Sequence, residues 1–129
     1  MSLRFLPLAL GLACALALPA AVRAQNDIYG SEDLTSTPKL VSSAATARLI
    51  ARSMPEDVRR SNVGGTVQIQ FTIDKAGHVE PSSIEVVSTP LPTLATAARS
   101  VVEKMEFVPG KKDGAPVRTR VQLPIIYKP

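Results

Sequence analysis

Three consecutive segments decide the fold of this chain: GGTVQIQFTIDKAGHV at residues 64–79, LPTLATAARSVVEKMEF at 91–107 and VPGKKDGAPVRTRVQLPIIY at 108–127. The first segment begins with a strand, because apolar and uncharged polar side chains alternate there with the period of a half-buried strand. The apolar positions of this strand are Val67, Ile69, Phe71 and Ile73. The residues Asp74 to Gly77 then predict a hairpin turn, in which the glycine supplies a positive φ.

A second strand is expected after this turn, over residues 79–87. Its apolar positions are Val79, Ile84, Val86 and Val87. Pro81 interrupts it. Because proline has no N–H to donate to a neighbouring strand, we expect this strand at an edge of the sheet.

A helix and a last strand complete the series. The apolar residues between about Thr93 and Glu106 recur at the spacing of one helical face, which predicts an amphipathic helix. From Val117 to Tyr127 mostly apolar residues alternate with Arg118, Arg120, Gln122 and Pro124. This alternation predicts a strand, and its proline again favours a sheet edge.

The order strand, strand, helix, strand predicts an α+β fold. We expect a small mixed sheet of three strands (ββαβ) with one helix packed on one face. The hairpin makes the first two strands antiparallel, and the helical connection allows the third strand to run parallel to the second. The first strand then lies in the middle, with the other two at opposite edges. So small a core leaves the other face or an edge available to a partner.

The residues before the sheet are more ambiguous. Residues 25–38 are polar and are typical of a flexible leader. Good helix formers from Ala44 to Arg52 predict a short helix, which Ser42 or Ser43 would cap. Pro55 should end it and open a second short helix over residues 56–61. The folded domain is therefore expected to occupy residues 54–129, after a leader and possible helix at 25–53.

The N-terminus resembles a secretory signal peptide. Arg4 precedes an apolar run at residues 6–18, and Val22-Arg23-Ala24 offers small residues to a signal peptidase. We expect cleavage after Ala24 and export to the periplasm. The alternative is an uncleaved inner-membrane anchor, which the shortness of the apolar run disfavours. Cys14 is the only cysteine and lies in this run, so the mature chain would hold neither a disulfide nor a cysteine metal site.

Charge and composition do not favour a role in nucleic-acid binding. Removal of Arg4 and Arg23 from the 15 basic residues leaves 13 against 11 acidic ones, which is close to balance. The chain has no Trp and few aromatic residues on which bases could stack. We therefore expect no nucleic-acid partner.

The sequence also offers little for catalysis. His78 is the only histidine, and Asp74, Ser82 and Ser83 lie near it on or beside a hairpin, where a rigid triad is not expected. The chain has no Gly-x-Ser-x-Gly motif, and one histidine with scattered carboxylates does not supply the converging ligands of a metal site. We expect a protein that is not an enzyme and has no cofactor.

An ordered series of residues resembles the C-terminal domain of the TonB family. It covers about Pro55 to Tyr127, most of the mature chain. The series reads Pro55-x-x-x-Arg59, Gly65-Thr66-Val67-x-Ile69-x-Phe71-x-Ile73-Asp74-x-x-Gly77-x-Val79, Leu94-x-x-Ala97-Ala98-x-x-Val101, Phe107-x-Pro109, Gly114-x-Pro116-Val117 and Val121-x-Leu123-Pro124-Ile125. Two residues depart from the family pattern: Met105 stands where a Trp is usual, and Met54 where a Tyr commonly precedes Pro55. Both replacements are apolar and flexible, so packing can survive.

The resemblance implies a periplasmic domain that binds the N-terminal segment of outer-membrane receptors. In that family the segment adds as a strand to the edge of the last strand, by main-chain hydrogen bonds. The binding edge expected here comprises Arg118, Thr119, Arg120, Val121, Gln122, Leu123 and Ile125. The side chains of Arg118, Arg120 and Gln122 would share one face and orient a polar or acidic peptide. Charged residues on an edge strand can equally serve only to deter aggregation.

Other functions remain open at this point. A force-transmitting TonB has a membrane helix with a functional His and a Pro-rich spacer, whereas this chain has no His before His78 and only Pro38 between residues 25 and 54. A stand-alone periplasmic module is therefore expected. The alternatives are a structural protein of the envelope that pairs through its edge strand, as a homodimer or with another envelope protein, and a membrane-anchored accessory. Membrane contact would follow only if the N-terminal segment is not cleaved.

Overall fold

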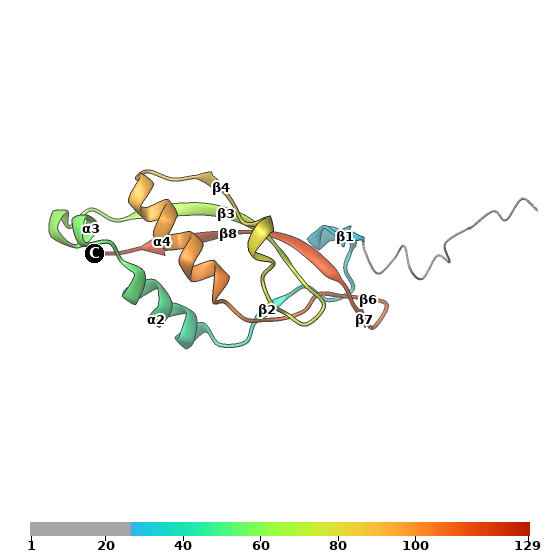
Figure 1. Ribbon diagram of the computed structural model, residues 1–129. Coiled ribbons are helices and arrows are strands. Elements are labelled where there is room, and N and C mark those ends of the chain that lie inside the picture. Colours follow the sequence, from blue (N-terminus) through green and yellow to red (C-terminus); the bar gives the residue numbers. More distant parts are fainter. Residues whose placement is uncertain (1–26) are drawn as a thin grey trace, which may run out of the picture.

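The computed structural model describes residues 27–129, so the expected signal peptide, with Cys14 and the cleavage point after Ala24, lies outside the described residues. The described chain forms a twisted sheet with helices against one of its faces (Figure 1). The main sheet has four strands in the order β1-β8-β3-β4. This architecture confirms the α+β class.

The helices are α2 (Ser43–Ser53), α3 (Glu56–Ser61) and α4 (Pro92–Glu103), with 3-10 turns η1 (Ser31–Asp33) and η2 (Pro81–Ser83). The strands of the main sheet are β1 (Ile28–Tyr29), β3 (Gly65–Ile73), β4 (Glu85–Ser88) and β8 (Arg118–Tyr127). Two small ribbons pair β2 (Lys39–Leu40) with β5 (Phe107–Val108), and β6 (Lys111–Lys112) with β7 (Ala115–Pro116).

The central strand is β3, as its alternation predicts. It pairs antiparallel with β8 over its whole length, from Gly65 opposite Tyr127 to Ile73 opposite Thr119, without a register shift. Its other side pairs with β4, which is the terminal strand of the sheet, as the proline in this region predicts. The apolar side chains of β3 all point to the helices, where they are buried.

The connection between β3 and β4 is more irregular than a simple hairpin. Gly77 has a φ of 89°, and a Cβ there would lie against the carbonyl oxygen of Phe107. Pro81 to Ser83 form the turn η2, so only residues 85–87 of the expected second strand lie in β4, which continues to Ser88. The proline thus shortens the strand because it starts a 3-10 turn.

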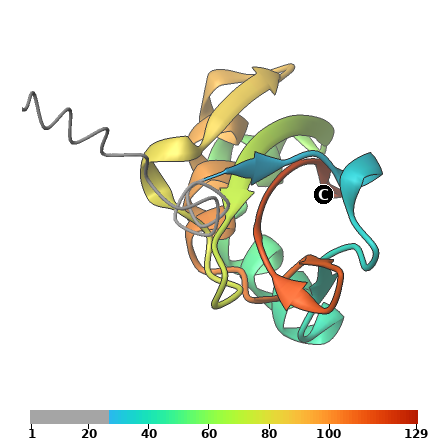
Figure 2. The ribbon, with the colours of Figure 1, turned by 90° about the vertical axis from the view of Figure 1, so that its right-hand side faces the viewer.

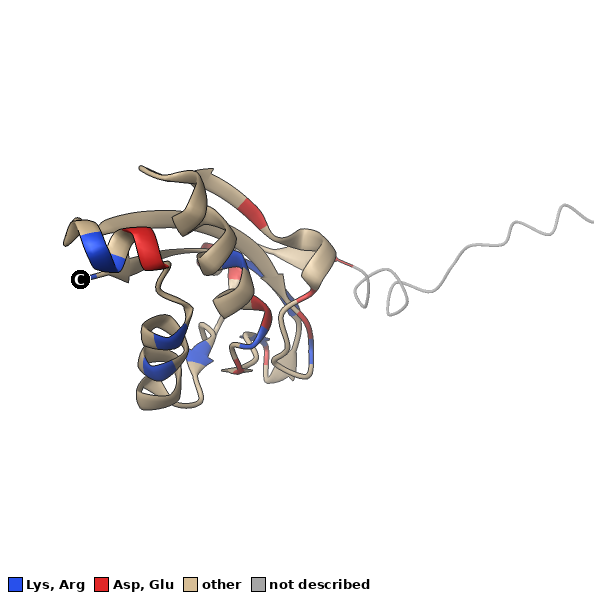
Figure 3. Cartoon of the chain, turned by 60° about the vertical axis from the view of Figure 1, so that its left-hand side comes forward, with Lys and Arg blue, Asp and Glu red and all other residues tan. Residues whose placement is uncertain are grey.

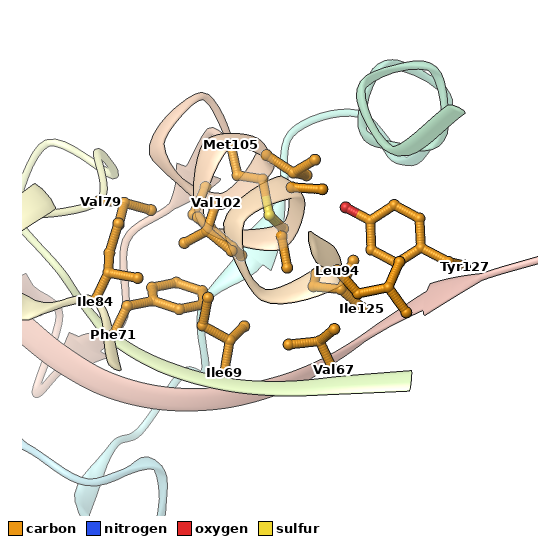
Figure 4. Close-up of a cluster of buried hydrophobic side chains, with 14 of the residues drawn as sticks. Val67, Ile69, Phe71, Val79, Ile84, Leu94, Val102, Met105, Ile125 and Tyr127 are labelled. Carbon is orange, nitrogen blue, oxygen red and sulfur yellow. The ribbon is translucent and has the colours of Figure 1, made fainter. Parts of the chain in front are cut away.

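The core lies between α4 and the sheet (Figure 4). α4 buries the face that its apolar spacing predicts, which consists of Leu94, Ala97, Ala98, Val101 and Val102. The rings of Phe71 and Phe107 contact each other with their centroids 5.7 Å apart. α4 ends at Glu103, earlier than expected, yet Met105 just beyond it is still buried. The residue that replaces the family's usual Trp therefore keeps a core position.

The two helices before the sheet are confirmed. The Oγ of Ser42 accepts a hydrogen bond from the N–H of Ala45 at 3.1 Å and caps α2. α2 packs against α4 and the end of β8, where the hydroxyls of Ser53 and Tyr127 lie 3.0 Å apart. This hydrogen bond joins the last core residue of the chain to the first long helix.

The N-terminal stretch differs from the expected flexible leader. β1 pairs parallel with β8, with Ile28 opposite Arg118 and Tyr29 opposite Thr119. Ser36 then forms an antiparallel bridge with Lys111, and β2 pairs with β5. The expectation of three strands with β8 at the edge was therefore wrong for the first two residues of β8. Two paired residues carry no hydrophobic period, so the sequence pattern gives no sign of them.

The core arrangement predicts a strong effect of truncating Leu94, which has no exposed surface. We expect Leu94→Ala to lower the free energy of unfolding by about 2–5 kcal/mol, because it removes buried methyl groups and leaves a cavity. Val87, which is 51% exposed on β4, provides the control. We expect Val87→Ala to change the free energy of unfolding by less than about 0.5 kcal/mol. Urea titrations of both variants measure the difference. Equal effects would contradict this account of the core.

The Tyr127 hydroxyl predicts a loss of stability in alkali. Burial raises its pKa above the usual 10.0, and the hydrogen bond with Ser53 offsets part of the rise. Since the folded state holds the proton more tightly, its stabilising effect is complete below pH 10.0 and is lost as pH rises through the folded pKa. Tyr127→Phe should cost about 1 kcal/mol at neutral pH, through the lost hydrogen bond. That difference from the native chain should shrink above pH 10.0, whereas a constant difference would exclude the effect.

Candidate functional site

The open edge of the main sheet is the outer side of β8. β1 covers the start of this side, where Ile28 lies opposite Arg118 and Tyr29 opposite Thr119, and in this parallel register the carbonyl of Tyr29 faces the N–H of Arg120. Within residues 27–129, no strand pairs with β8 on this side from Arg120 to Tyr127. We call this stretch, residues 120–127, the free edge.

The ladder between β3 and β8 determines which main-chain groups of the free edge point outward. The N–H of Thr72 is bonded to the Ser83 hydroxyl, and its carbonyl accepts from Glu80, so both point away from β8. Thr72 and Arg120, which lie opposite each other, are thus a non-hydrogen-bonded pair, and such pairs alternate along an antiparallel ladder. The residues whose N–H and carbonyl groups point outward are therefore Arg120, Gln122, Pro124 and Ile126.

Pro124 leaves a gap in this row of outward groups. It lies opposite Gln68 in the ladder with β3, at a position where β3 needs no N–H from it. The outward side receives its carbonyl but no donor. The ladder is therefore complete while the free edge lacks one hydrogen-bond donor, which is how proline is tolerated on an edge strand.

The side chains of the free edge divide between the two faces of the sheet. Arg120 and Gln122 are exposed on the face without helices, and Ile126 is exposed at the edge beside α2. Val121 and Leu123 are half-buried on the opposite face, and Ile125 belongs to the core. Within the free edge, only Arg120 and Gln122 of the predicted site residues therefore present both a polar side chain and outward main-chain groups.

Arg118 and Thr119 have other partners in the structure. The guanidinium of Arg118 makes two bonds with the carboxylate of Glu80, from Nε to Oε1 at 3.0 Å and from Nη2 to Oε2 at 2.8 Å. This hydrogen bonding raises the pKa of Arg118 further, so the side chain stays charged. Thr119 is buried, and its hydroxyl donates to the carbonyl of Val117 at 3.3 Å. Both residues thus support the sheet next to the free edge.

Two hollows flank the free edge at its ends. The first, of about 490 Å³, lies beside Arg120 and Gln122 and is bounded on its other side by residues 28–32. The second, of about 270 Å³, is formed by one face of α2 with Ile126 and Lys128. Its α2 residues are Ala47, Ile50, Ala51 and Met54. A strand on the free edge would thus have a hollow with both polar and apolar walls near one end and a mainly apolar one near the other.

β8 carries Arg118 and Arg120, and α2 carries Arg48 and Arg52, the blue bands of that helix in Figure 3. Arg118 is paired with Glu80 and Arg52 lines a hollow between α2 and α4, so Arg120 is the basic side chain of the free edge itself. Neither β8 nor α2 contains an Asp or a Glu. This arrangement favours a partner with negative charge.

The polar residues near His78 take structural roles in the turn. The Asp74 carboxylate accepts hydrogen bonds from the N–H groups of Ala76 and His78, each at 2.9 Å. The hydroxyl of Ser83 donates to the carbonyl of Glu80 at 2.6 Å and accepts from Thr72. These bonds stabilise the backbone. Residues 27–129 contain no group of His, Cys, Asp and Glu side chains arranged to bind a metal ion.

Comparison with known families identifies the domain. The model of the Gram-negative bacterial TonB protein C-terminal domain matches residues 51–129. The chain belongs to the TonB C-terminal family. No curated protein matches it in a search for relatives. TonB C-terminal domains are non-enzymatic protein-interaction modules of the bacterial envelope that serve energy transduction and interact with outer-membrane receptors.

The described part of the chain has no helix that is both long and apolar enough to cross a membrane. The family match begins within α2, so β1 and β2 precede the matched residues. Sequence reasoning missed the contact of β1 with β8 and the hollow that it bounds. The only signal available was the pair Ile28-Tyr29 in an otherwise polar stretch.

The gap at Pro124 predicts that its replacement makes the free edge more adhesive. Pro124→Ala adds an outward N–H, so that Gln122, residue 124 and Ile126 can all donate to a partner strand. We expect this variant to self-associate more strongly than the native chain, by about fivefold or more in the association constant, for each hydrogen bond gained.

Light scattering over a range of protein concentrations measures this effect. Gln122→Ala serves as the control, since it changes an outward residue but keeps its N–H. Equal association of the two variants would mean that the proline does not protect the edge.

Proposed function

We propose that this TonB C-terminal domain binds the N-terminal segments of outer-membrane receptors by strand addition at the free edge, residues 120–127. The observation that carries the proposal is the row of outward main-chain groups on β8, which has no strand partner among residues 27–129. Main-chain hydrogen bonds would provide affinity, and the alternate side chains of the peptide would provide selectivity. The proposal includes export to the periplasm after cleavage behind Ala24.

The surroundings of the free edge suggest which peptide side chains are accepted. One alternate set would lie on the face without helices, near Arg120 and Gln122, where acidic or polar groups suit the guanidinium. The other set would lie on the helix side, near Leu123 and α2. At the far end the hollow below Ile126 offers apolar contact. A segment that alternates acidic or polar residues with apolar ones fits both faces.

The test is a titration of the protein with synthetic peptides that cover receptor N-terminal segments. Amide signals of the protein, followed by NMR, should shift along residues 118–127 and little elsewhere. A lack of response to every such peptide would overturn the proposal.

A matched pair of variants separates main-chain from side-chain recognition. Gln122→Pro removes an outward N–H but no bond to β3, whereas Gln122→Ala removes only the side chain. Strand addition predicts that the proline variant binds about five- to tenfold more weakly than the alanine variant, because one net hydrogen bond of about 1 kcal/mol is lost. Equal affinities would mean that the peptide does not bind as a strand.

Pairing of the free edge with a second copy of the chain is the competing use of the same groups. Ile126 is 51% exposed at this edge, and the adjacent hollow is mainly apolar, which gives such pairing a contact surface. Light scattering distinguishes the two functions. A stable dimer that accepts no peptide would support the structural role, whereas a monomer that binds peptide would support recognition.

A further inference from the structure

The residues before α2 already include a short strand on β8. Ile28 and Tyr29 lie parallel to Arg118 and Thr119, which directly precede the free edge. After Gly30 the chain turns through η1 and lies across the hollow from Arg120 and Gln122. In Figure 2 this blue segment lies alongside the red strand β8. A longer strand that paired with β8 from Arg118 onward would meet this segment.

The segment is held by few contacts, and all of them are near the surface. The Nζ of Lys112 lies 4.7 Å from the centroid of the Tyr29 ring. Directly after residues 27–34, Thr35 and Ser36 anchor the chain, because their N–H groups donate to the carbonyl of Lys111 at 2.9 and 3.1 Å and the Thr35 hydroxyl accepts from the N–H of Asp113 at 3.1 Å. None of residues 27–33 is buried. Such a segment opens at low free energy compared with the long ladder between β3 and β8.

Its charge is opposite to that of the surface on which it lies. The segment 27–34 reads DIYGSEDL, with three acidic residues and no basic one. It lies beside Lys112 and Arg120, and beside Arg118, whose charge is paired with Glu80. It thus combines a short extended stretch, Ile28 and Tyr29, with the acidic side chains of η1, and acidic side chains are what Arg120 favours in a partner.

We propose that residues 27–34 are an internal competitor for the outer side of β8, and that an acidic extended strand from another molecule displaces them. The inference rests on the proposed function in that it concerns the same edge. The internal segment is tethered near its site, so its effective concentration is high and a free peptide must overcome it. Loosening the segment should therefore expose the edge and strengthen binding.

The experiment uses the chain's own segment as the probe, a synthetic capped peptide DIYGSEDL. Tyr29→Pro removes an N–H from β1, and Tyr29→Phe is the control that keeps both the N–H and the ring. We expect the peptide to bind the proline variant at least about tenfold more tightly than it binds the control or the native chain. Its amide shifts should lie at residues 118–122. Equal binding by all three proteins, or binding by none, would overturn the proposal.

Two further arms make the result specific. Lys112→Ala leaves the backbone of β1 intact and removes only the contact with Tyr29, so it should strengthen peptide binding in the same direction but less. The neutral peptide NIYGSQNL should bind the proline variant about tenfold more weakly than the acidic one if charge contributes. If Lys112→Ala leaves the affinity unchanged, the contact of Lys112 with Tyr29 does not hold the segment in place. If the neutral peptide binds as tightly as the acidic one, charge does not contribute to binding.

Receptor peptides distinguish this proposal from the proposed function. If they bind the native chain and Tyr29→Pro with equal affinity, strand addition stands and internal competition fails. If the proline variant binds DIYGSEDL but no receptor peptide binds any form, the internal contact stands and receptor recognition fails.

Discussion

The antiparallel pairing of β3 with β8 is the constraint on which the rest of the structure depends. Its register, Gly65 opposite Tyr127 through Ile73 opposite Thr119, aligns the apolar positions of both strands under α4. A shift of one residue would turn Ile125 and Tyr127 to the solvent and expose Arg120 or Gln122 to the core. The same register decides which groups of β8 are bonded to β3 and which point outward. Core and free edge are therefore two results of one alignment.

The predictable parts of the fold are those in which each element buries one face. β3, β8 and α4 each repeat an apolar residue with the period of their backbone, so their type and order follow from the sequence. The end of α4 and the shape of the β3–β4 connection cannot be predicted from such a pattern. Met105 is buried beyond the helix, and the turn at Pro81 depends on the fit of Ser83 to the N–H of Thr72. These details are decided by tertiary contacts.

The candidate site was predictable to a similar extent. The alternation of Arg118 to Ile125 identifies a strand near an edge, and family resemblance adds its expected use. Neither the alternation nor the family resemblance could reveal that Arg118 bonds to Glu80 or that Ile28 and Tyr29 cover the first residues of β8. A parallel pair of two residues is stabilised mainly by main-chain groups, which every sequence possesses. Which residues point outward also needs a register, and therefore coordinates.

The proline at position 124 bears on how long a complex at this edge would last. Most differences in affinity between related complexes arise in the dissociation rate. One absent main-chain hydrogen bond, worth about 1 kcal/mol, shortens the lifetime of a bound strand about fivefold. An edge with all its donors would prolong the lifetime of the correct complex, but it would also prolong the pairing of unrelated strands. An edge with one missing hydrogen bond suits a protein that must bind and release its partners repeatedly.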